Sequence, residues 1–107
     1  MTTVETIERD KLHAGFRELL QVEAGRRVLY WMLAQSGMYE SAFTGDAAST
    51  NFILGRQEIG RRLTGEIDAI DPRFYPQLLI DIAEIRDRDR AAAEAMKKPE
   101  NDDGDDD

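Results

Sequence analysis

The chain has 107 residues, no cysteine and a formal net charge of −8. This length favours one domain with a small core, and the lack of cysteine excludes a disulfide framework and a thiolate metal site. Because the first 30 residues hold no apolar signal segment and no apolar run reaches the ~18 residues that span a bilayer, we expect a protein assembled in the cytoplasm, away from membranes.

The negative charge is concentrated at the C-terminal end. Residues 100–107 hold six acids and no base, which leaves 16 acids and 14 bases, a net charge of −2, over residues 1–99. Runs of like charge are normally solvated and disordered. We therefore expect a single helical domain over residues 1–98 and a disordered acidic tail over residues 99–107. Such a tail either keeps the protein in solution or binds a basic partner.

The spacing of apolar residues predicts a first helix over residues 4–21. Thr2 and Thr3 are both suited to cap it, and Glu5 follows Thr2 at the spacing of a capping box. His13, the only histidine, is expected at the surface of this helix or at the boundary of the core. The apolar stripe of this helix follows i, i+4, i+7 and i+8 spacing and consists of Leu12, Phe16, Leu19 and Leu20.

A second helix is predicted after a break or kink between Gln21 and Gly25. It should end at Ser36-Gly37, because glycine readily takes the left-handed conformation that closes a helix. Met38 is then placed to fold back on the last turn. The apolar face of this helix consists of Val28, Leu29, Met32 and Leu33, with Trp31 beside it.

The connection Tyr39–Thr50 contains the turn signal Gly45-Asp46 and leads to a third helix, with Ser49 or Thr50 as its N-cap. Asp71-Pro72 should end this helix and start a fourth, with aspartate as N-cap and proline as the first helical residue. The apolar stripe of the third helix consists of Phe52, Ile59, Leu63, Ile67 and Ile70.

The fourth helix has apolar residues only in its first half. Beyond Ile85 the sequence is rich in arginine, aspartate and alanine, and the pairs Glu84–Arg88 and Asp87–Arg90 are spaced to stabilise a helix without burial. We expect this half to project from the body, to end before Pro99, and to be either a solvated extension or a surface for a larger assembly. The apolar stripe consists of Phe74, Leu78, Ile82 and Ile85. The overall prediction is an all-α, four-helix domain.

Two segments place glycine beside arginine inside predicted helices. They are Gly25-Arg26-Arg27-Val28-Leu29 and, in the third helix, Gly55-Arg56 followed by Gly60-Arg61-Arg62-Leu63. A glycine inside a helix costs roughly 1 kcal/mol relative to alanine. A close approach of two backbones would offset this cost. We therefore predict that the second and third helices cross here, with the glycines inward and the arginines outward around a Met38–Phe43 loop.

No combination of side chains indicates catalysis, a cofactor or a metal. One histidine and no cysteine make neither a Cys/His dyad nor a two-histidine zinc site. The carboxylates Glu66, Asp68 and Asp71 lack the ligand spacing of an EF-hand loop, and Gly55–Gly60 lacks the companions of a phosphate-binding loop. We expect a protein that is not an enzyme and binds no cofactor or metal.

The arginines and two loop aromatics are the candidate contact residues. The arginines could bind phosphates, pair with acids of the same chain such as Glu23, Glu58 and Glu66, or meet a protein partner. Because residues 1–99 are slightly acidic, the charge pattern argues against direct nucleic-acid binding. The two loop aromatics either close one end of the core or form an exposed apolar knob. The candidates for protein contact are Arg26, Arg27, Tyr39, Phe43, Arg56, Arg61 and Arg62.

Four further aromatics lie on helix stripes and are expected in the core. They are Phe16, Trp31, Phe52 and Phe74.

These motifs resemble the Bbp19-like phage domain, a family of small tailed-phage proteins. The resemblance covers residues 16 to about 72. It implies a virion-associated or assembly role among head and packaging proteins, no enzymatic activity, and portal, capsid or tail components as partners for multiple copies. The residues that carry it are Phe16, Gly25-Arg26-Arg27-Val28-Leu29, Leu33, Ser36-Gly37, Tyr39, Ser41-Ala42-Phe43, Asn51-Phe52, Gly55-Arg56, Ile59-Gly60, Leu63 and Asp71-Pro72.

Two other functions stay open on the sequence. A host-directed inhibitor would use the acidic tail to imitate nucleic acid. A DNA-packaging accessory would use the arginines to contact phosphates. If the role is virion-associated, as the resemblance implies, we expect the protein in the phage particle after assembly in the host cytoplasm.

Overall fold

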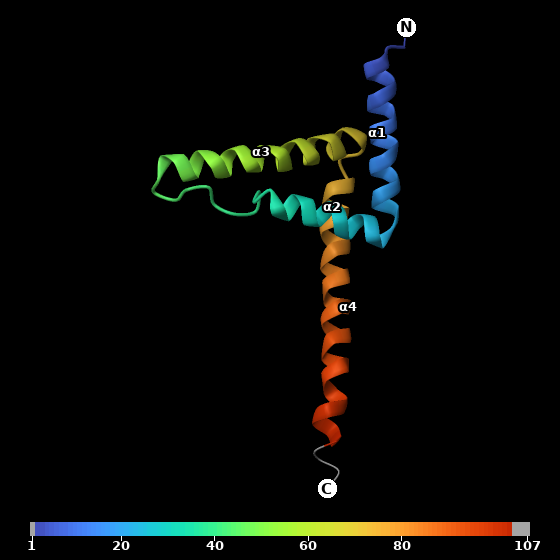
Figure 1. Ribbon diagram of the computed structural model, residues 1–107. Coiled ribbons are helices and arrows are strands. Elements are labelled where there is room, and N and C mark those ends of the chain that lie inside the picture. Colours follow the sequence, from blue (N-terminus) through green and yellow to red (C-terminus); the bar gives the residue numbers. More distant parts are fainter. Residues whose placement is uncertain (1, 104–107) are drawn as a thin grey trace.

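The computed structural model describes the backbone of residues 2–103 and the side chains of residues 2–97 (Figure 1). The chain forms four helices: α1 (Val4–Gln21), α2 (Glu23–Gln35), α3 (Ala47–Ile70) and α4 (Phe74–Asp103). None of the described residues forms a strand, so the predicted all-α, four-helix fold is confirmed. None of these helices has the length and apolarity needed to cross a membrane.

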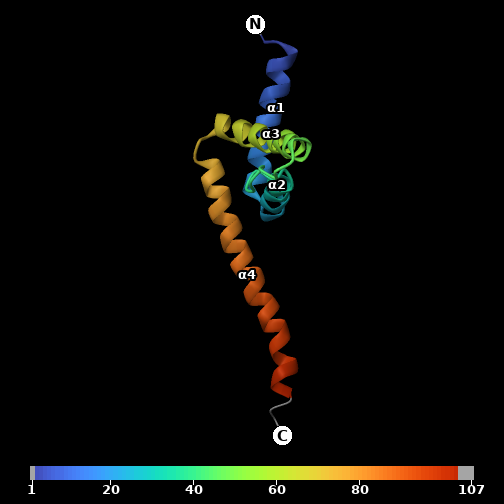
Figure 2. The same cartoon turned by 90° about the vertical axis from the view of Figure 1, so that its left-hand side faces the viewer.

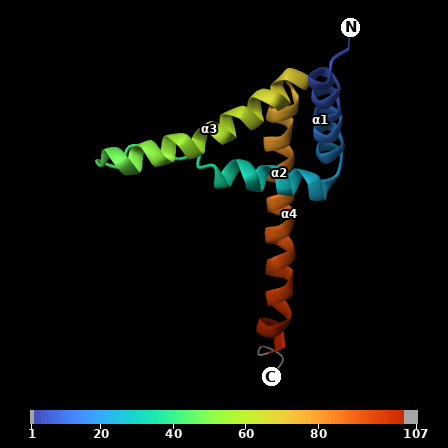
Figure 3. The same ribbon diagram turned by 45° about the horizontal axis from the view of Figure 1, so that its top comes forward.

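The four helices form an open, elongated molecule with extents of 76 × 42 × 20 Å. Helices α2 and α3 lie side by side and project to one side as an arm, joined by a loop at its far end (Figures 1 and 3). We call α2, the loop 36–46 and α3 the α2–α3 arm. The N-terminal half of α1 and the C-terminal half of α4 extend from the body in opposite directions (Figures 1 and 2).

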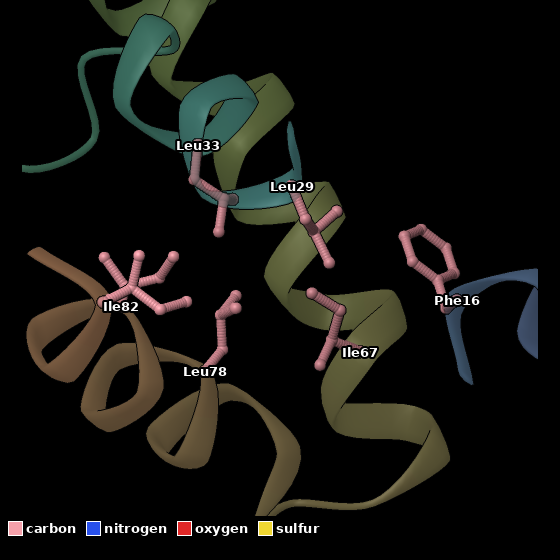
Figure 4. Close-up of a cluster of buried hydrophobic side chains, with 7 residues drawn as sticks. Phe16, Leu29, Leu33, Ile67, Leu78 and Ile82 are labelled. Atoms are coloured by element: carbon pink, nitrogen blue, oxygen red, sulfur yellow. The ribbon is translucent and has the colours of Figure 1, made fainter. Parts of the chain in front are cut away.

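The core lies where the four helices meet (Figure 4). Each helix contributes at least one buried apolar side chain, and Ile67 is the one large apolar residue of α3 that is buried. The predicted stripe of the fourth helix is confirmed in this core. The buried apolar side chains are Phe16, Leu29, Leu33, Ile67, Leu78, Ile82 and Ile85.

Many predicted core residues lie on the surface instead. Among the described side chains, seven large apolar ones are buried and fifteen are exposed. Long helices that cross at one place can bury only the residues within a few turns of the crossing, and the other residues of each stripe have no neighbouring helix. The predictions corrected by this finding concern Leu12, Leu19, Val28, Trp31, Phe52 and Ile59, all of which are exposed.

The first two helix junctions agree with the local sequence signals. Val22 is extended, with φ −117° and ψ 145°, which separates α1 from α2 as predicted. Gly37 has φ 72° and closes α2, and Met38 packs partly buried against the core. The N-cap of α1 is Thr3, whose hydroxyl accepts a hydrogen bond from the Thr6 amide, so the capping box from Thr2 does not form.

The starts of α3 and α4 differ from the prediction by two or more residues. Asp46 caps α3 in place of Ser49 or Thr50, because its carboxylate accepts hydrogen bonds from both the amide and the hydroxyl of Ser49. Asp71 is the C-cap of α3, and its carboxylate accepts a hydrogen bond from the Arg73 amide at 2.9 Å. This turn occupies Pro72 and Arg73, so α4 begins only at Phe74.

The helix glycines also correct the predicted crossing. A Cβ at Gly25 would lie 2.1 Å from the carbonyl oxygen of Leu19, so this glycine permits the corner between α1 and α2 and not a crossing with α3. A Cβ at Gly60 would lie 2.3 Å from the Ser36 hydroxyl, which confirms close packing of α3 on the end of α2. A Cβ at Gly55 would meet nothing within 4 Å.

Helix α4 projects as predicted but is longer than predicted. Its backbone is helical to Asp103, beyond the end expected before Pro99. A proline removes one backbone donor and strains the preceding turn without always ending a helix. Of the expected ion pairs, Asp87–Arg90 forms at 3.1 Å, whereas Arg88 pairs with Glu23 of α2 instead of Glu84. Of the predicted acidic tail, residues 99–107, the backbone of residues 99–103 forms the end of α4, whereas residues 104–107 lie outside the described residues.

Candidate functional site

Two of the candidate arginines hold the start of α2 against its neighbours. Arg26 Nη1 donates to the carbonyl oxygen of Leu20 at 2.8 Å, and its Nε lies 3.9 Å from a carboxylate oxygen of Asp81. Arg27 donates to Asp89 of α4 at 2.8 and 3.0 Å and to Glu23 at 3.2 Å. Both guanidinium groups are therefore engaged within the chain, where they join α1, α2 and α4.

The other three candidate arginines lie on α3. Arg56 has Nη2 3.9 Å from Glu40, and its guanidinium packs against Gly37. Arg61 and Arg62 both face Glu58, at 3.1 and 3.6 Å. The five arginines thus divide between two places on the molecule and each has an acid within 4.0 Å. Glu66, which we expected near them, binds His13 and Arg9 instead.

Acidification is expected to loosen the contact between α2 and α4. Hydrogen bonds from Arg88 and Arg27 lower the pKa of Glu23 below its ordinary 4.5, and a hydrogen bond from Arg27 lowers the pKa of Asp89 below 3.8. Because both folded-state pKa values are depressed, the stability that these carboxylates contribute is fully present above the ordinary values and is lost as the pH falls through the lowered ones. The melting temperature should therefore fall as the pH drops below about 4.5.

The doubly neutralised variant Glu23→Gln/Asp89→Asn is the control for this pH dependence. It should melt below the wild type at neutral pH and show a smaller loss on acidification. If the melting temperatures of the wild type and the variant fall by the same amount over this pH range, these two carboxylates do not cause the pH dependence.

Tyr39 is anchored to the body by its ring and its hydroxyl. The ring stacks on Tyr30 with centroids 5.9 Å apart, and the hydroxyl forms a 2.7 Å hydrogen bond with the Tyr75 hydroxyl. Burial, followed by this hydrogen bond, raises the pKa of Tyr39. Arg86 lies 4.7 Å from the centroid of Tyr30. Tyr39 therefore fastens the end of α2 to α4, although 46% of it is exposed.

The rest of the loop is held by hydrogen bonds and leaves Phe43 outside. The buried side chain of Gln57 donates from Nε2 to the carbonyl oxygens of Gly37 and Glu40, at 2.8 and 2.9 Å. The hydroxyls of Thr44 and Thr50 lie 3.0 Å apart, within hydrogen-bond distance. Phe43 is 83% exposed on this ordered loop. Of the two loop aromatics, Tyr39 packs against the body and Phe43 forms the exposed knob.

An apolar groove runs between the two helices of the α2–α3 arm. It has a volume of about 350 Å³ and includes Trp31, Met32, Arg56, Ile59 and Leu63 in its lining. Trp31 and Ile59 are each 61% exposed. Sequence reasoning assigned both to the core. One available signal was that Trp31 lies beside, and not within, the stripe of buried leucines on α2.

The candidate carboxylate cluster does not gather at one point. Glu66 binds His13 at 2.8 Å and Arg9 at 3.3 Å, while Asp71 binds Arg73 at 2.8 Å. These ion pairs give Glu66 and Asp71 a role in stabilising the fold. In the part of the chain with described side chains, no three metal-ligating residues come together.

The comparison with known proteins identifies the family. The model of the Bbp19-like phage proteins matches residues 16–80. This chain belongs to that family. The family match begins at Phe16, as the motifs predicted, and extends beyond Asp71-Pro72 into α4. In this Bbp19-like protein, the matched region contains the whole α2–α3 arm and excludes most of α1. No curated protein and no solved structure matches the chain.

Proposed function

We propose that this Bbp19-like protein is a small virion-associated assembly protein of a bacteriophage. It acts without catalysis, binds other virion proteins in multiple copies, and makes these contacts through the α2–α3 arm. Membership of a phage protein family supports the phage origin. The observation that carries the proposed contact is the apolar groove of the arm, with Trp31 and Ile59 each 61% exposed.

The arm has the chemistry of a protein-contact surface. Aromatic side chains are the commonest anchors of interfaces, and the arm exposes Trp31, Phe43 and Phe52, the last two at 83% and 71%. Each large apolar side chain contributes about 1.5–3 kcal/mol when it is fully buried. A few such residues therefore suffice to determine affinity. The candidates Arg56, Arg61 and Arg62 lie on the same helix and supply polar neighbours for these anchors.

The loop supports this function because it is already ordered. Gln57 holds the loop backbone at Gly37 and Glu40, so Phe43 is presented on a fixed frame. A loop that is ordered before binding loses less conformational entropy on association. The support for nucleic-acid contact is weaker, because every candidate arginine has an acid of the same chain within 4.0 Å. The side chains of the acidic tail, on which the inhibitor hypothesis depends, lie outside the described residues.

Incorporation into particles tests the proposal. We expect the wild-type protein in purified particles of the phage that encodes it, in several copies per particle by quantitative mass spectrometry. The double variant Trp31→Ser/Phe43→Ser removes two exposed anchors and should lower the copy number about tenfold or more. The matched control is Ile80→Ser, which removes an apolar side chain of 53% exposure from α4 and should leave incorporation unchanged.

Two results would refute the proposal. One is the absence of the wild-type protein from purified particles. The other is equal incorporation of the double variant and the wild type. Circular dichroism of both variants should give the wild-type helix content, because the substituted side chains lie outside the core.

A further inference from the structure

A second exposed apolar surface lies on α1, apart from the α2–α3 arm. Leu12, Leu19 and Val22 are exposed by 51%, 37% and 53% and border a shallow hollow above Gly15. The hollow is lined by residues of α1 and the adjoining Val22 alone. The fold therefore leaves this side of the helix open to another molecule.

Gly15 is unexplained within the single chain. It lies in the interior of α1, where alanine is favoured over glycine, and a Cβ at this position would meet nothing within 4 Å. Gly25 and Gly60, by contrast, have neighbours that leave no room for a Cβ. A Cβ at Gly55 or Gly65 would also meet nothing, but Gly15 in addition lines the hollow between Leu12 and Leu19, where a close approach from outside the chain would account for the glycine. We propose that α1 packs antiparallel against α1 of a second copy, about a two-fold axis at Gly15.

The register of this pair follows from the positions around Gly15. In an antiparallel pair centred there, residues at equal distances before and after the glycine face each other. Leu12 lies three residues before it and Leu19 four residues after it, so each Leu12 packs beside the partner's Leu19. The absence of a side chain at Gly15 lets the two helices approach closely at the centre. The two leucine contacts cover the hollow from both sides.

The charges on α1 favour a second copy of this chain as the partner and an antiparallel orientation of the two α1 helices. Lys11 and Glu18 are two helical turns apart and both line the hollow. Neither has an ion-pair partner within 4.0 Å among the side chains that the structure describes. Antiparallel pairing at Gly15 brings each Lys11 to the partner's Glu18, and the two-fold axis generates the contact twice. Parallel pairing would place like charges together.

The expected affinity is modest. A contact between two single helices is at the small end of specific interfaces, which bury about 800 Å² per partner at standard size. We expect a dissociation constant in the micromolar range, measurable by analytical ultracentrifugation of the full chain over about 1–500 μM. The α2–α3 arm takes no part in this pair, so the two surfaces can be tested separately.

Charge reversal tests the proposed pairing. Lys11→Glu and Glu18→Lys each bring like charges together across the axis, and each should raise the dissociation constant about tenfold or more. The double variant Lys11→Glu/Glu18→Lys restores opposite charges and should return the constant to within about threefold of the wild type. If both single variants weaken self-association and the double variant does not restore it, the proposed register is wrong.

Gly15→Leu tests the close approach. A Cβ at this position has open space in the single chain, so the helix content should be kept while the dissociation constant rises about tenfold or more through steric exclusion. The matched control is Gly65→Leu on α3, where a Cβ also meets nothing within 4 Å, and it should leave self-association unchanged. The proposal is wrong if the wild type is monomeric throughout the concentration range or if Gly15→Leu associates as the wild type does.

Discussion

Replacing Gly25 with alanine is expected to lower the free energy of unfolding by about 2–4 kcal/mol. The new Cβ would lie 2.1 Å from the carbonyl oxygen of Leu19 and 2.7 Å from two further backbone atoms of that residue. Backbone atoms at the end of a helix cannot rotate away as a flexible side chain can. Helix α1 would therefore have to separate from α2 at their corner, and Phe16 would be drawn out of the core.

Urea unfolding followed by circular dichroism would measure this loss. The matched control is Gly65→Ala, where the added methyl group meets nothing within 4 Å. Alanine is the better helix former, so the control should gain about 0.5–1 kcal/mol. A lower free energy of unfolding for Gly25→Ala and a higher one for Gly65→Ala would identify the packing at the corner between α1 and α2 as the cause. A loss under about 0.5 kcal/mol for Gly25→Ala would contradict the tight corner.

The second large effect is expected at Ile67. This side chain is fully buried at the crossing of the helices and is the one large apolar group that α3 buries among the described residues (Figure 4). Replacing it with alanine removes three carbon atoms and leaves a cavity, which costs about 2–5 kcal/mol in well-packed cores. Because only seven large apolar side chains are buried among the described residues, the core around the cavity is too small to compensate for the lost contacts.

Ile59→Ala is the matched control for Ile67→Ala. It makes the same chemical change on the same helix, but Ile59 is 61% exposed. Its effect on the free energy of unfolding should be within about 0.5 kcal/mol of zero. Similar losses at both positions in urea unfolding would show that the stabilising contacts of α3 extend along the arm. The contrast would also separate the residues that stabilise the fold from those available to a partner.

The sequence alone predicted the features that depend on neighbouring residues. The extent of α1, the break at Val22 and the left-handed Gly37 were predicted because helix periodicity, chain breaks and glycine caps act over a few residues. The buried stripe of α4 was predicted for the same reason. The family resemblance also came from the sequence, and the family match over residues 16–80 confirms it.

Which apolar residues are buried was decided by the tertiary structure. An apolar stripe shows which side of a helix is suited to a core, but it contains no information about how far along the helix a neighbour extends. Ile67 and Ile59 belong to one stripe, and only Ile67 lies at the crossing. For this reason Trp31, Phe52 and Ile59 were assigned to the core, and the groove of the arm was missed.

The partners of the charged and glycine residues were also decided by tertiary structure. Arg27 binds Asp89, 62 residues away, and Gly25 meets α1 instead of the predicted α3. Sequence spacing specifies pairs only within a helix, whereas these contacts depend on the angles at which the four helices cross. Composition and periodicity thus determined an all-α protein with a small core, and the family resemblance indicated its phage origin. The three-dimensional arrangement alone decided which apolar faces of α1 and of the α2–α3 arm stay open for other molecules.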